Sequence, residues 1–197
     1  MYEIMLDKKQ SHSTRLDTYD NSWFDTGKNI FLRSLWYMVN VVFFINPLNP
    51  ISGLKVFFLR LFGAKVGRGV IIKPAVNIKY PWKLEIGDYA WIGEKVWIDN
   101  LAEVKIGAHS CLSQGAMLLT GNHNYKKASF DLMLGEIELE EGAWIGAQAT
   151  VCPGVKCYSH SILSVGSVAN SDLNAWTIYQ GNPAQAVRKR SIEEKHG

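Results

Sequence analysis

Histidine is the residue type in this chain best suited to acid–base chemistry, because an imidazole titrates close to neutral pH. The sequence contains five histidines in different surroundings, which are His12, His109, His123, His160 and His196. His123 lies in a long segment, residues 119–138, that departs from the regular pattern on either side of it. An imidazole on such a loop can take a proton from a hydroxyl group, but it can also be an ordinary polar loop residue. The spacing alone leaves both interpretations open.

The remaining histidines and the cysteines give weaker chemical signals. His109 and His160 occupy the same phase of a repeat and are predicted to face solvent. Three cysteines, an odd number without a Cys-x-x-Cys spacing, predict buried free thiols of a reducing compartment: Cys111, Cys152 and Cys157. We therefore expect neither a disulfide framework nor a metal centre.

These residues are set in a six-residue repeat that predicts a parallel β-helix. An aliphatic residue recurs every six positions, often followed by Gly, as in Ile86-Gly87, Ile92-Gly93 and Ile145-Gly146. A period of six matches neither an α-helix nor an alternating strand. Each hexapeptide is expected to form a short strand and a corner that small residues or turn formers occupy, and three complete one coil of a triangular prism. Gly121 is expected to let the backbone bend sharply before His123.

The pattern divides the chain into three parts. The predicted boundaries are 1–63 for an N-terminal arm and helices packed on the β-helix, 64–170 for the β-helix with its protruding loop 119–138, and 171–197 for a C-terminal extension. The helices are expected at about 28–45 and 52–62, because Pro47 and Pro50 interrupt any helix between them. The extension should contain a strand at 175–179, a turn at 181–184 and a basic segment from Val187 onward.

An apolar stretch at residues 35–45 is too short to span a bilayer, which needs about 20 residues. We favour a helix packed on the first coils or on a neighbouring subunit, and a helix resting on a membrane surface is the alternative. The net charge of +3 and the lack of a ladder of basic and aromatic residues argue against nucleic acid as a partner. The polar first twenty residues show no secretory signal, so we expect a cytoplasmic protein, with the inner face of the membrane as a possible location.

Two further segments carry a resemblance to a known family. The repeats, together with Thr120–Tyr125 and the ending Trp176–Ala184, resemble the hexapeptide-repeat acyltransferases, including galactoside and maltose O-acetyltransferases. Residues 52–64 and 72–82 are also similar to the colanic-acid-type (WcaF-like) exopolysaccharide acetyltransferases. The likeness covers about residues 22–190. It implies a mostly β fold, namely a left-handed parallel β-helix with an N-terminal helical segment and a short C-terminal strand or helix extension. It also implies a homotrimer with active sites between subunits, and acetyl transfer from acetyl-CoA to a saccharide hydroxyl.

The resemblance also implies roles for individual residues. His123 is expected to be the general base, and the backbone N–H of Ala147 is expected to stabilise the developing oxyanion. The residues expected along the coenzyme are Trp144, Ala147, Val165, Gly166, Asn170, Ser171, Pro183 and Arg188. The residues expected to contact the acceptor saccharide are Asp99, Asn100, Ser113 and Gln114.

The sequence also departs from the family pattern at Val165, Asn170 and Ser171, where a Gly-Ala-Gly-Ser run and a Thr-Lys pair are usual. These departures keep open a second hypothesis, a trimeric scaffold without catalysis. A third, lesser hypothesis is a metal site like that of γ-carbonic anhydrases. A site of that kind would need two histidines five positions apart, whereas no His-x-x-x-x-His occurs in this sequence. The acceptor sugar, its hydroxyl and the acyl group are left open.

Overall fold

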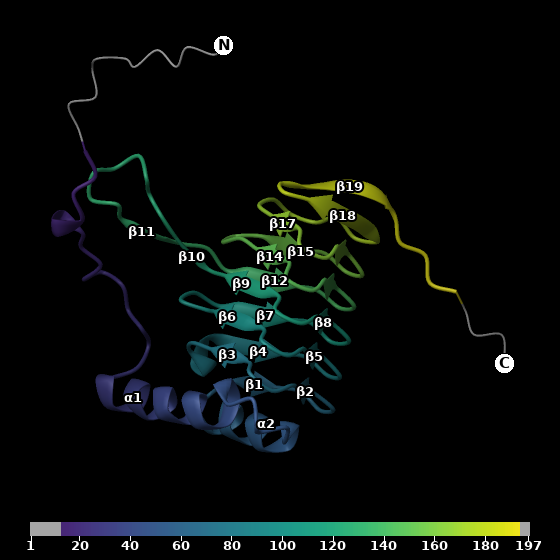
Figure 1. The fold of residues 1–197 in the computed structure, drawn as a ribbon, viewed down its shortest axis with the longest axis horizontal. Helices are drawn as coiled ribbons and strands as arrows, with labels where there is room; N and C mark the ends of the chain where they lie inside the picture. Colours follow the sequence, from purple (N-terminus) through teal and green to yellow (C-terminus); the bar gives the residue numbers. More distant parts are fainter. Residues whose placement is uncertain (1–12, 194–197) are drawn as a thin grey trace, which may run out of the picture.

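The computed structural model describes residues 13–193 and contains three parallel sheets wound into a prism (Figure 1). His12 and His196 lie outside the described residues. Sheet A consists of β1 (Lys65–Val66), β4 (Leu84–Ile86), β7 (Val104–Ile106), β12 (Ile137–Leu139) and β15 (Lys156–Cys157). Sheet B consists of β2 (Ile71–Ile72), β5 (Trp91–Ile92), β8 (Cys111–Leu112), β13 (Trp144–Ile145), β16 (Ile162–Leu163), β18 (Thr177–Gly181) and β19 (Ala184–Lys189). Sheet C consists of β3 (Asn77–Ile78), β6 (Trp97–Asp99), β9 (Met117–Leu119), β14 (Thr150–Val151) and β17 (Val168–Ala169).

Successive strands along the chain pass from sheet A to B to C and back to A, so each coil contributes one strand to each sheet. In sheet B the registers Ile72↔Ile92, Ile92↔Leu112 and Leu112↔Ile145 stack the first residue of each hexapeptide on its equivalent in the next coil. All of these side chains are fully buried. The six-residue period thus places one aliphatic column inside each sheet, which confirms the predicted β-helix.

The corners of the coils follow the prediction only in part. A Cβ on Gly146 would lie 2.6 Å from the backbone nitrogen of Val165, so the position after the inward aliphatic residue does require a small residue. Two positions after this small residue, the backbone adopts a left-handed conformation, and this position accepts large side chains. His109 (φ 56°) stacks on Tyr89 with ring centroids 5.3 Å apart, and His160 (φ 58°) stacks on Trp176 at 4.2 Å. Ring stacking between coils therefore offsets the strain of these L-residues.

The N-terminal segment contains a 3₁₀-helix, η1 (Leu16–Thr18), and two longer helices at the base of the prism. Helix α1 (Ile30–Val39) begins at Asn29, whose side chain accepts the N–H of Leu32 at 3.0 Å. It continues as a π-helix, η2 (Asn40–Ile45), and α2 (Ser52–Leu61) follows the proline-containing break. A further 3₁₀-helix, η3 (Pro81–Lys83), occupies the first interruption of the repeat. No helix among residues 13–193 is both long and apolar enough to cross a bilayer.

The helices provide hydrogen-bond partners for the first coil, which has no coil beneath it. The Trp36 indole donates to Ile78 O at 2.9 Å on sheet C. The buried Lys55 ammonium donates to Lys73 O at 2.8 Å on sheet B, and the Arg60 guanidinium donates to Val66 O at 2.8 Å on sheet A. On each of the three sides of the open coil, a helix side chain therefore caps a backbone carbonyl.

The other end of the prism is closed by an antiparallel hairpin of β18 and β19. Val187 and Arg188, expected to begin a basic terminal segment, instead lie in β19, with Arg188 opposite Ile178. The expected strand or helix extension is thus a β-hairpin in the described residues. All three cysteines are free, and burial raises the pKa of the inward-facing Cys157 to about 12.

Replacing Lys55 tests the capping of the first coil. Lys55→Met removes the donor to Ile72 O and Lys73 O and leaves these carbonyls, the first buried and the second partly buried, without that partner. We expect the free energy of unfolding to fall by about 2 kcal/mol in urea denaturation. The matched control is Lys65→Met, whose side chain is exposed, and it should change stability by less than about 0.5 kcal/mol. Equal effects of the two substitutions would contradict this account.

Candidate active site

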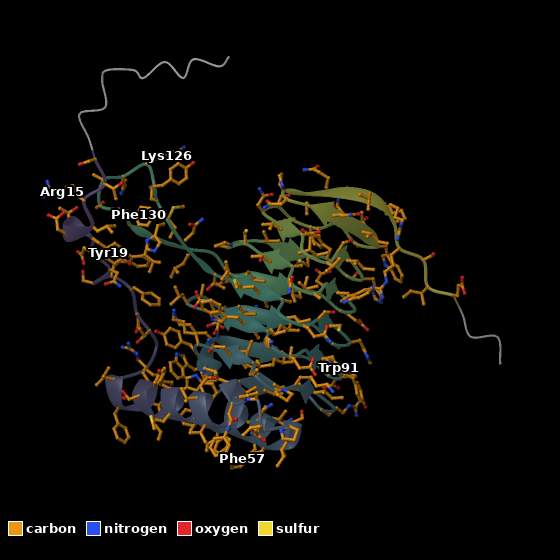
Figure 2. All side chains as sticks on the ribbon, viewed as in Figure 1. Arg15, Tyr19, Phe57, Trp91, Lys126 and Phe130 are labelled. Carbon is orange, nitrogen blue, oxygen red and sulfur yellow. The ribbon has the colours of Figure 1, made fainter. Side chains whose placement is uncertain are left out.

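His123 is held in a defined orientation on a hairpin that projects from the prism. The hairpin consists of β10 (Gly121–His123) and β11 (Leu132–Leu134), and it leaves the coil between sheets C and A (Figure 1). The imidazole stacks on Phe130 with centroids 4.5 Å apart and planes at 9°. The ring of Tyr19, from the N-terminal arm, lies against the same imidazole with ring centroids 5.7 Å apart. Figure 2 shows Tyr19 and Phe130 together at the hairpin.

The hydrogen bond of the His123 ring fixes which nitrogen can act as a base. Nδ1 lies 2.9 Å from the carbonyl oxygen of Phe130. A carbonyl only accepts hydrogen bonds, so in the neutral ring Nδ1 carries the proton and Nε2 presents its lone pair. Phe130 adopts φ 55°, a left-handed conformation that is costly for an aromatic residue. The hairpin thus holds the imidazole as a proton acceptor at Nε2.

The neighbouring residues explain why the hairpin keeps this shape. Lys127 and Ser129 both donate to the Asp131 carboxylate, at 2.8 and 2.6 Å, and these contacts lower the pKa of that carboxyl group. The N–H of Arg15 in the N-terminal arm donates to Ala128 O at 2.8 Å. The role expected for Gly121 is wrong: its φ is not in the left-handed region, and it lies in β10. A Cβ there would lie 2.7 Å from a methyl carbon of Leu101, so a larger residue would have to displace the end of that side chain.

The structure brings four of the eight expected coenzyme residues, Trp144, Ala147, Val165 and Gly166, onto one corner column between sheets B and C. The Trp144 indole donates to the Ser113 hydroxyl at 2.9 Å. Gly166 N donates to Ala147 O at 2.9 Å in the next coil. Ser113 and Gln114, expected on the acceptor side, therefore belong to the same column. Val165 projects from it with 70% of its surface exposed.

The backbone N–H of Ala147 is available on this column. Within residues 13–193 this N–H donates no hydrogen bond. A free N–H at an exposed corner can donate to an oxygen that gains negative charge during a reaction. The oxyanion role that the family resemblance implies for Ala147 stays a prediction.

The remaining coenzyme residues lie elsewhere on the upper coils. Pro183 and Arg188 are exposed on the β18–β19 hairpin. Asn170 and Ser171 follow β17 and lie at the corner between sheets C and A, which is the corner that carries the His123 hairpin two coils earlier. The predicted residues thus form two columns, one along each edge of sheet C.

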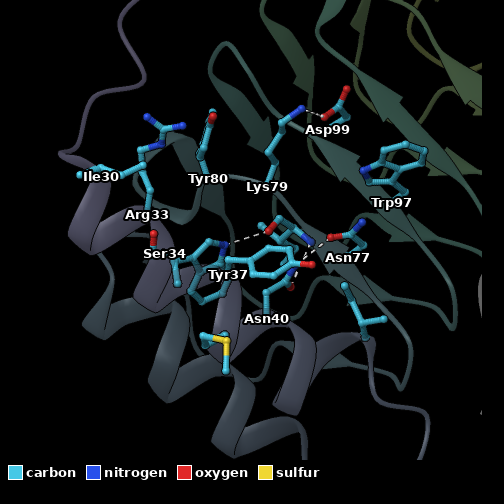
Figure 3. Close-up of a pocket in the computed structure, with 14 residues that line it drawn as sticks. Ile30, Arg33, Ser34, Tyr37, Asn40, Asn77, Lys79, Tyr80, Trp97 and Asp99 are labelled. Carbon is cyan, nitrogen blue, oxygen red and sulfur yellow. Dashed lines mark hydrogen bonds and ion pairs between the residues drawn. The ribbon is translucent and has the colours of Figure 1, made fainter.

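A pocket of about 530 Å³ lies between α1–η2 and the lower strands of sheet C (Figure 3). Asp99 lines it and pairs with Lys79 at 2.9 Å, with the Asp99 side chain mostly shielded from solvent. Tyr37, Tyr80 and Trp97 supply aromatic surface to the same pocket. Aromatic faces beside a carboxylate and amides suit a polyhydroxylated ligand.

The expected role of Asn100 as a sugar contact is corrected by this structure. Asn100 is fully buried. Its side-chain amide donates to Tyr80 O at 2.6 Å and to Lys83 O at 3.1 Å, and its oxygen accepts the Tyr80 N–H. These bonds tie two coils together and leave nothing for a ligand.

Within one chain the two columns do not form a single site. His123 is on the hairpin at one edge of sheet C, whereas Trp144 and Ala147 are at the other edge. Among residues 13–193, no three His, Cys, Asp or Glu side chains gather in a way that could hold a metal ion.

Sequence reasoning missed several residues around these sites. Tyr19 and Phe130 both contact His123, but nothing in the repeat pattern connects them to it. The sequence could have identified Lys79 as the partner of Asp99, because the two residues occupy equivalent positions in successive coils, one coil apart. Tyr37 and Trp97 were not identified as lining a pocket with Asp99.

Comparison with known proteins finds a relative over most of the chain. The chain is 38% identical over 164 residues to the Escherichia coli (strain K12) protein named "Putative colanic acid biosynthesis acetyltransferase WcaF". The match covers 83% of this chain and 90% of that protein. No model of a known protein family matches the chain.

Solved structures share the fold at lower identity. A hexapeptide-repeat acetyltransferase of Vibrio cholerae O1 biovar eltor, complexed with acetyl coenzyme A, gives a TM-score of 0.73 at 22% identity, covering 82% of this chain and 88% of that chain. A maltose O-acetyltransferase of Clostridium difficile 630 gives a TM-score of 0.74 at 18% identity, and the match covers 83% of this chain and 90% of that chain. These similarities show a common fold.

The hydrogen bond to Phe130 O predicts the tautomer of His123. In the neutral ring we expect the proton on Nδ1 and an unprotonated Nε2, because the carbonyl holds the Nδ1 proton. Nitrogen-15 NMR of labelled histidine distinguishes the two ring nitrogens. His109 is the internal control, since its ring makes no hydrogen bond within residues 13–193. A proton found on Nε2 of His123 would show that the ring is held differently.

Proposed function

This chain belongs to the WcaF-like family of hexapeptide-repeat acetyltransferases, and on that basis we propose that it transfers an acetyl group from acetyl-CoA to a hydroxyl of a saccharide. The observation that carries the proposal is the orientation of His123. Its Nδ1 is bound to Phe130 O, and its Nε2 is left free to accept a proton. A hydroxyl is a poor nucleophile until a base removes its proton, so this is the group that O-acetylation requires.

The proposed reaction needs no covalent enzyme intermediate. Nε2 of His123 removes the proton from the acceptor hydroxyl as its oxygen attacks the thioester carbonyl carbon of acetyl-CoA. The backbone N–H of Ala147 donates to the carbonyl oxygen, which becomes negatively charged in the tetrahedral intermediate. That intermediate collapses with cleavage of the carbon–sulfur bond, and the coenzyme thiolate takes the proton from His123. The products are the acetyl ester and free coenzyme A.

Assembly as a homotrimer would complete the site. The His123 hairpin and the Ala147 column lie on opposite edges of sheet C. A threefold rotation can place the hairpin edge of one subunit against the Ala147 edge of the next, so that every subunit uses both of its edges. This arrangement supports the proposal that each active site is built by two chains.

The pocket lined by Asp99 and Trp97 supports a saccharide as the acceptor. The Asp99 carboxylate accepts hydrogen bonds from sugar hydroxyls, and aromatic faces pack on the apolar side of a sugar ring. The relative of this chain is named for colanic acid biosynthesis, so we propose a surface polysaccharide or its precursor as the acceptor class. We propose that the reaction takes place in the cytoplasm.

The coenzyme is proposed to run along the upper coils, from Trp144 and Ala147 toward the β18–β19 hairpin. Arg188 is exposed on β19 and can pair with the coenzyme phosphates. The side chain of Val165 projects outward beside this path. Asn170 and Ser171 lie at the opposite edge of sheet C, so in the proposed trimer they would approach the coenzyme from the neighbouring subunit. Calorimetric titration with coenzyme A distinguishes this proposal from a scaffold, which would bind none.

Substitution of His123 tests its role as the general base. We expect His123→Ala to lower kcat for acetylation of saccharide acceptors by about 10²–10⁴-fold and to leave coenzyme A affinity unchanged. His109→Ala is the matched control, because His109 is stacked on Tyr89 at a distant corner, and it should retain activity. Unchanged acetylation by the His123 variant would remove this residue from the mechanism.

Mixed oligomers test the two-chain site. Neither His123→Ala nor Ala147→Trp should be active alone, the second because a large side chain would fill the coenzyme path. When the two variants are co-expressed in equal amounts, about one quarter of the sites should combine two intact surfaces and regain activity. A site built within one chain would leave the mixture inactive. Thermal unfolding by circular dichroism checks that both variants fold.

A further inference from the structure

The helices at the base of the prism expose an apolar layer, in which Met38 and Ile45 also line the pocket beside sheet C. Along α1 and η2 the exposed residues Phe31, Leu35, Met38, Val42 and Ile45 recur at intervals of three and four, so they form one stripe. Phe31 is 75% exposed and Met38 is 59% exposed. Phe57 and Leu61 of α2 extend the layer, and Figure 2 shows Phe57 below the prism.

The opposite face of the same helices packs against the prism. Trp36, Phe44 and Leu59 are buried against the first coil. Phe43 and Phe58 hold η2 and α2 together with ring centroids 4.6 Å apart. The helices are therefore apolar on two faces, and only one of these faces has a partner within the described chain. A contiguous exposed apolar layer of this kind marks a binding surface.

The charge of this end of the molecule identifies what the layer binds. Residues 26–84 contain no Asp or Glu, but they contain nine of the 21 Lys and Arg residues: Lys28, Arg33, Lys55, Arg60, Lys65, Arg68, Lys73, Lys79 and Lys83. The rest of the chain holds the other twelve, against all 18 acidic residues. The molecule is therefore strongly polarised, with a positive base and an acidic remainder.

Part of this positive charge has no acidic partner. Lys65, Arg68 and Lys79 pair with carboxylates of the next coil. Lys28 and Arg33, at the start of α1, form no salt bridge within residues 13–193, and Arg60 donates only to backbone carbonyls. Cations thus border the apolar layer at both helices.

We propose that the helical base docks on the surface of an anionic lipid bilayer, beyond the acetyl transfer proposed above. The stripe from Phe31 to Ile45 lies at the boundary between headgroups and acyl chains, and the surrounding cations contact lipid phosphates. The layer rests on the membrane and does not cross it.

The same charges disfavour a second copy of the chain as the occupant. Two bases facing each other would bring two positive ends together, and their repulsion would oppose the burial of apolar surface. An anionic bilayer supplies apolar contact and the opposite charge at once. Charge complementarity therefore selects the lipid surface.

Vesicle flotation with the full chain tests this proposal without any assay of acetyl transfer. We expect binding to vesicles of phosphatidylcholine mixed with phosphatidylglycerol, weaker binding to phosphatidylcholine alone, and release by high salt. The double variant Phe31→Ser/Met38→Ser, which changes only exposed side chains, should lower the partition coefficient by about tenfold. Lys28→Glu should weaken binding to the anionic vesicles only.

The matched control is Val187→Ser/Ile192→Ser, which removes two exposed apolar side chains from the C-terminal hairpin and tail. It should bind vesicles like the unsubstituted chain. Equal losses in both double variants, or no binding to anionic vesicles by the unsubstituted chain, would overturn the proposal. Light scattering shows whether Phe31→Ser/Met38→Ser instead lowers the oligomeric state, which would assign the layer to contacts between copies. None of these outcomes depends on whether His123 is the catalytic base.

Discussion

Main-chain hydrogen bonds between successive coils are the interaction on which the rest of this structure depends. Gly87 N donates to Ile106 O at 2.7 Å, and Gly107 N donates to Leu139 O at 2.6 Å one coil further on. Each coil provides hydrogen-bond partners for the backbone groups of its neighbour. The first and last coils therefore each have one side on which backbone N–H and C=O groups lack a partner coil. The helices close one end through Trp36, Lys55 and Arg60, and the β18–β19 hairpin closes the other. The polar side chains of otherwise apolar helices therefore follow from the architecture.

A regular prism has no natural place for acid–base chemistry. Its inward positions are aliphatic, and its outward positions repeat without distinction from coil to coil. The candidate chemical groups lie where the repeat is interrupted. The excursion after β9 supplies His123 together with the Phe130 carbonyl that orients it, and the end of β6, where the repeat shifts, supplies Asp99 beside its pocket. The coils thus serve as a rigid frame that fixes the distance between these interruptions.

The sequence predicted the frame well because a period of six requires only local regularity. It also predicted His123 as a candidate general base, since a break in the six-residue period can be read directly from the sequence. It could not predict the partners of that residue. The contact with Phe130 depends on the hairpin register, and Tyr19 reaches the imidazole only through the path of the arm. Asn100 was misassigned because its burial depends on how the coil containing Tyr80 and Lys83 packs beneath it. Gly121 was assigned to a bend, whereas it lies in the extended strand β10 beside the Leu101 side chain.

The N-terminal arm joins regions that the repeat keeps apart. It is fixed to the lower coils where Trp82 donates to Thr26 O at 2.7 Å, and it reaches the hairpin through Arg15 and Tyr19. None of these arm residues contributes to the stacked core. Substitutions there can accumulate during evolution at little cost to folding while they reshape the surroundings of the imidazole. Descendants of one ancestral prism can therefore diverge in substrate range through a segment that comparisons of the repeats alone would ignore.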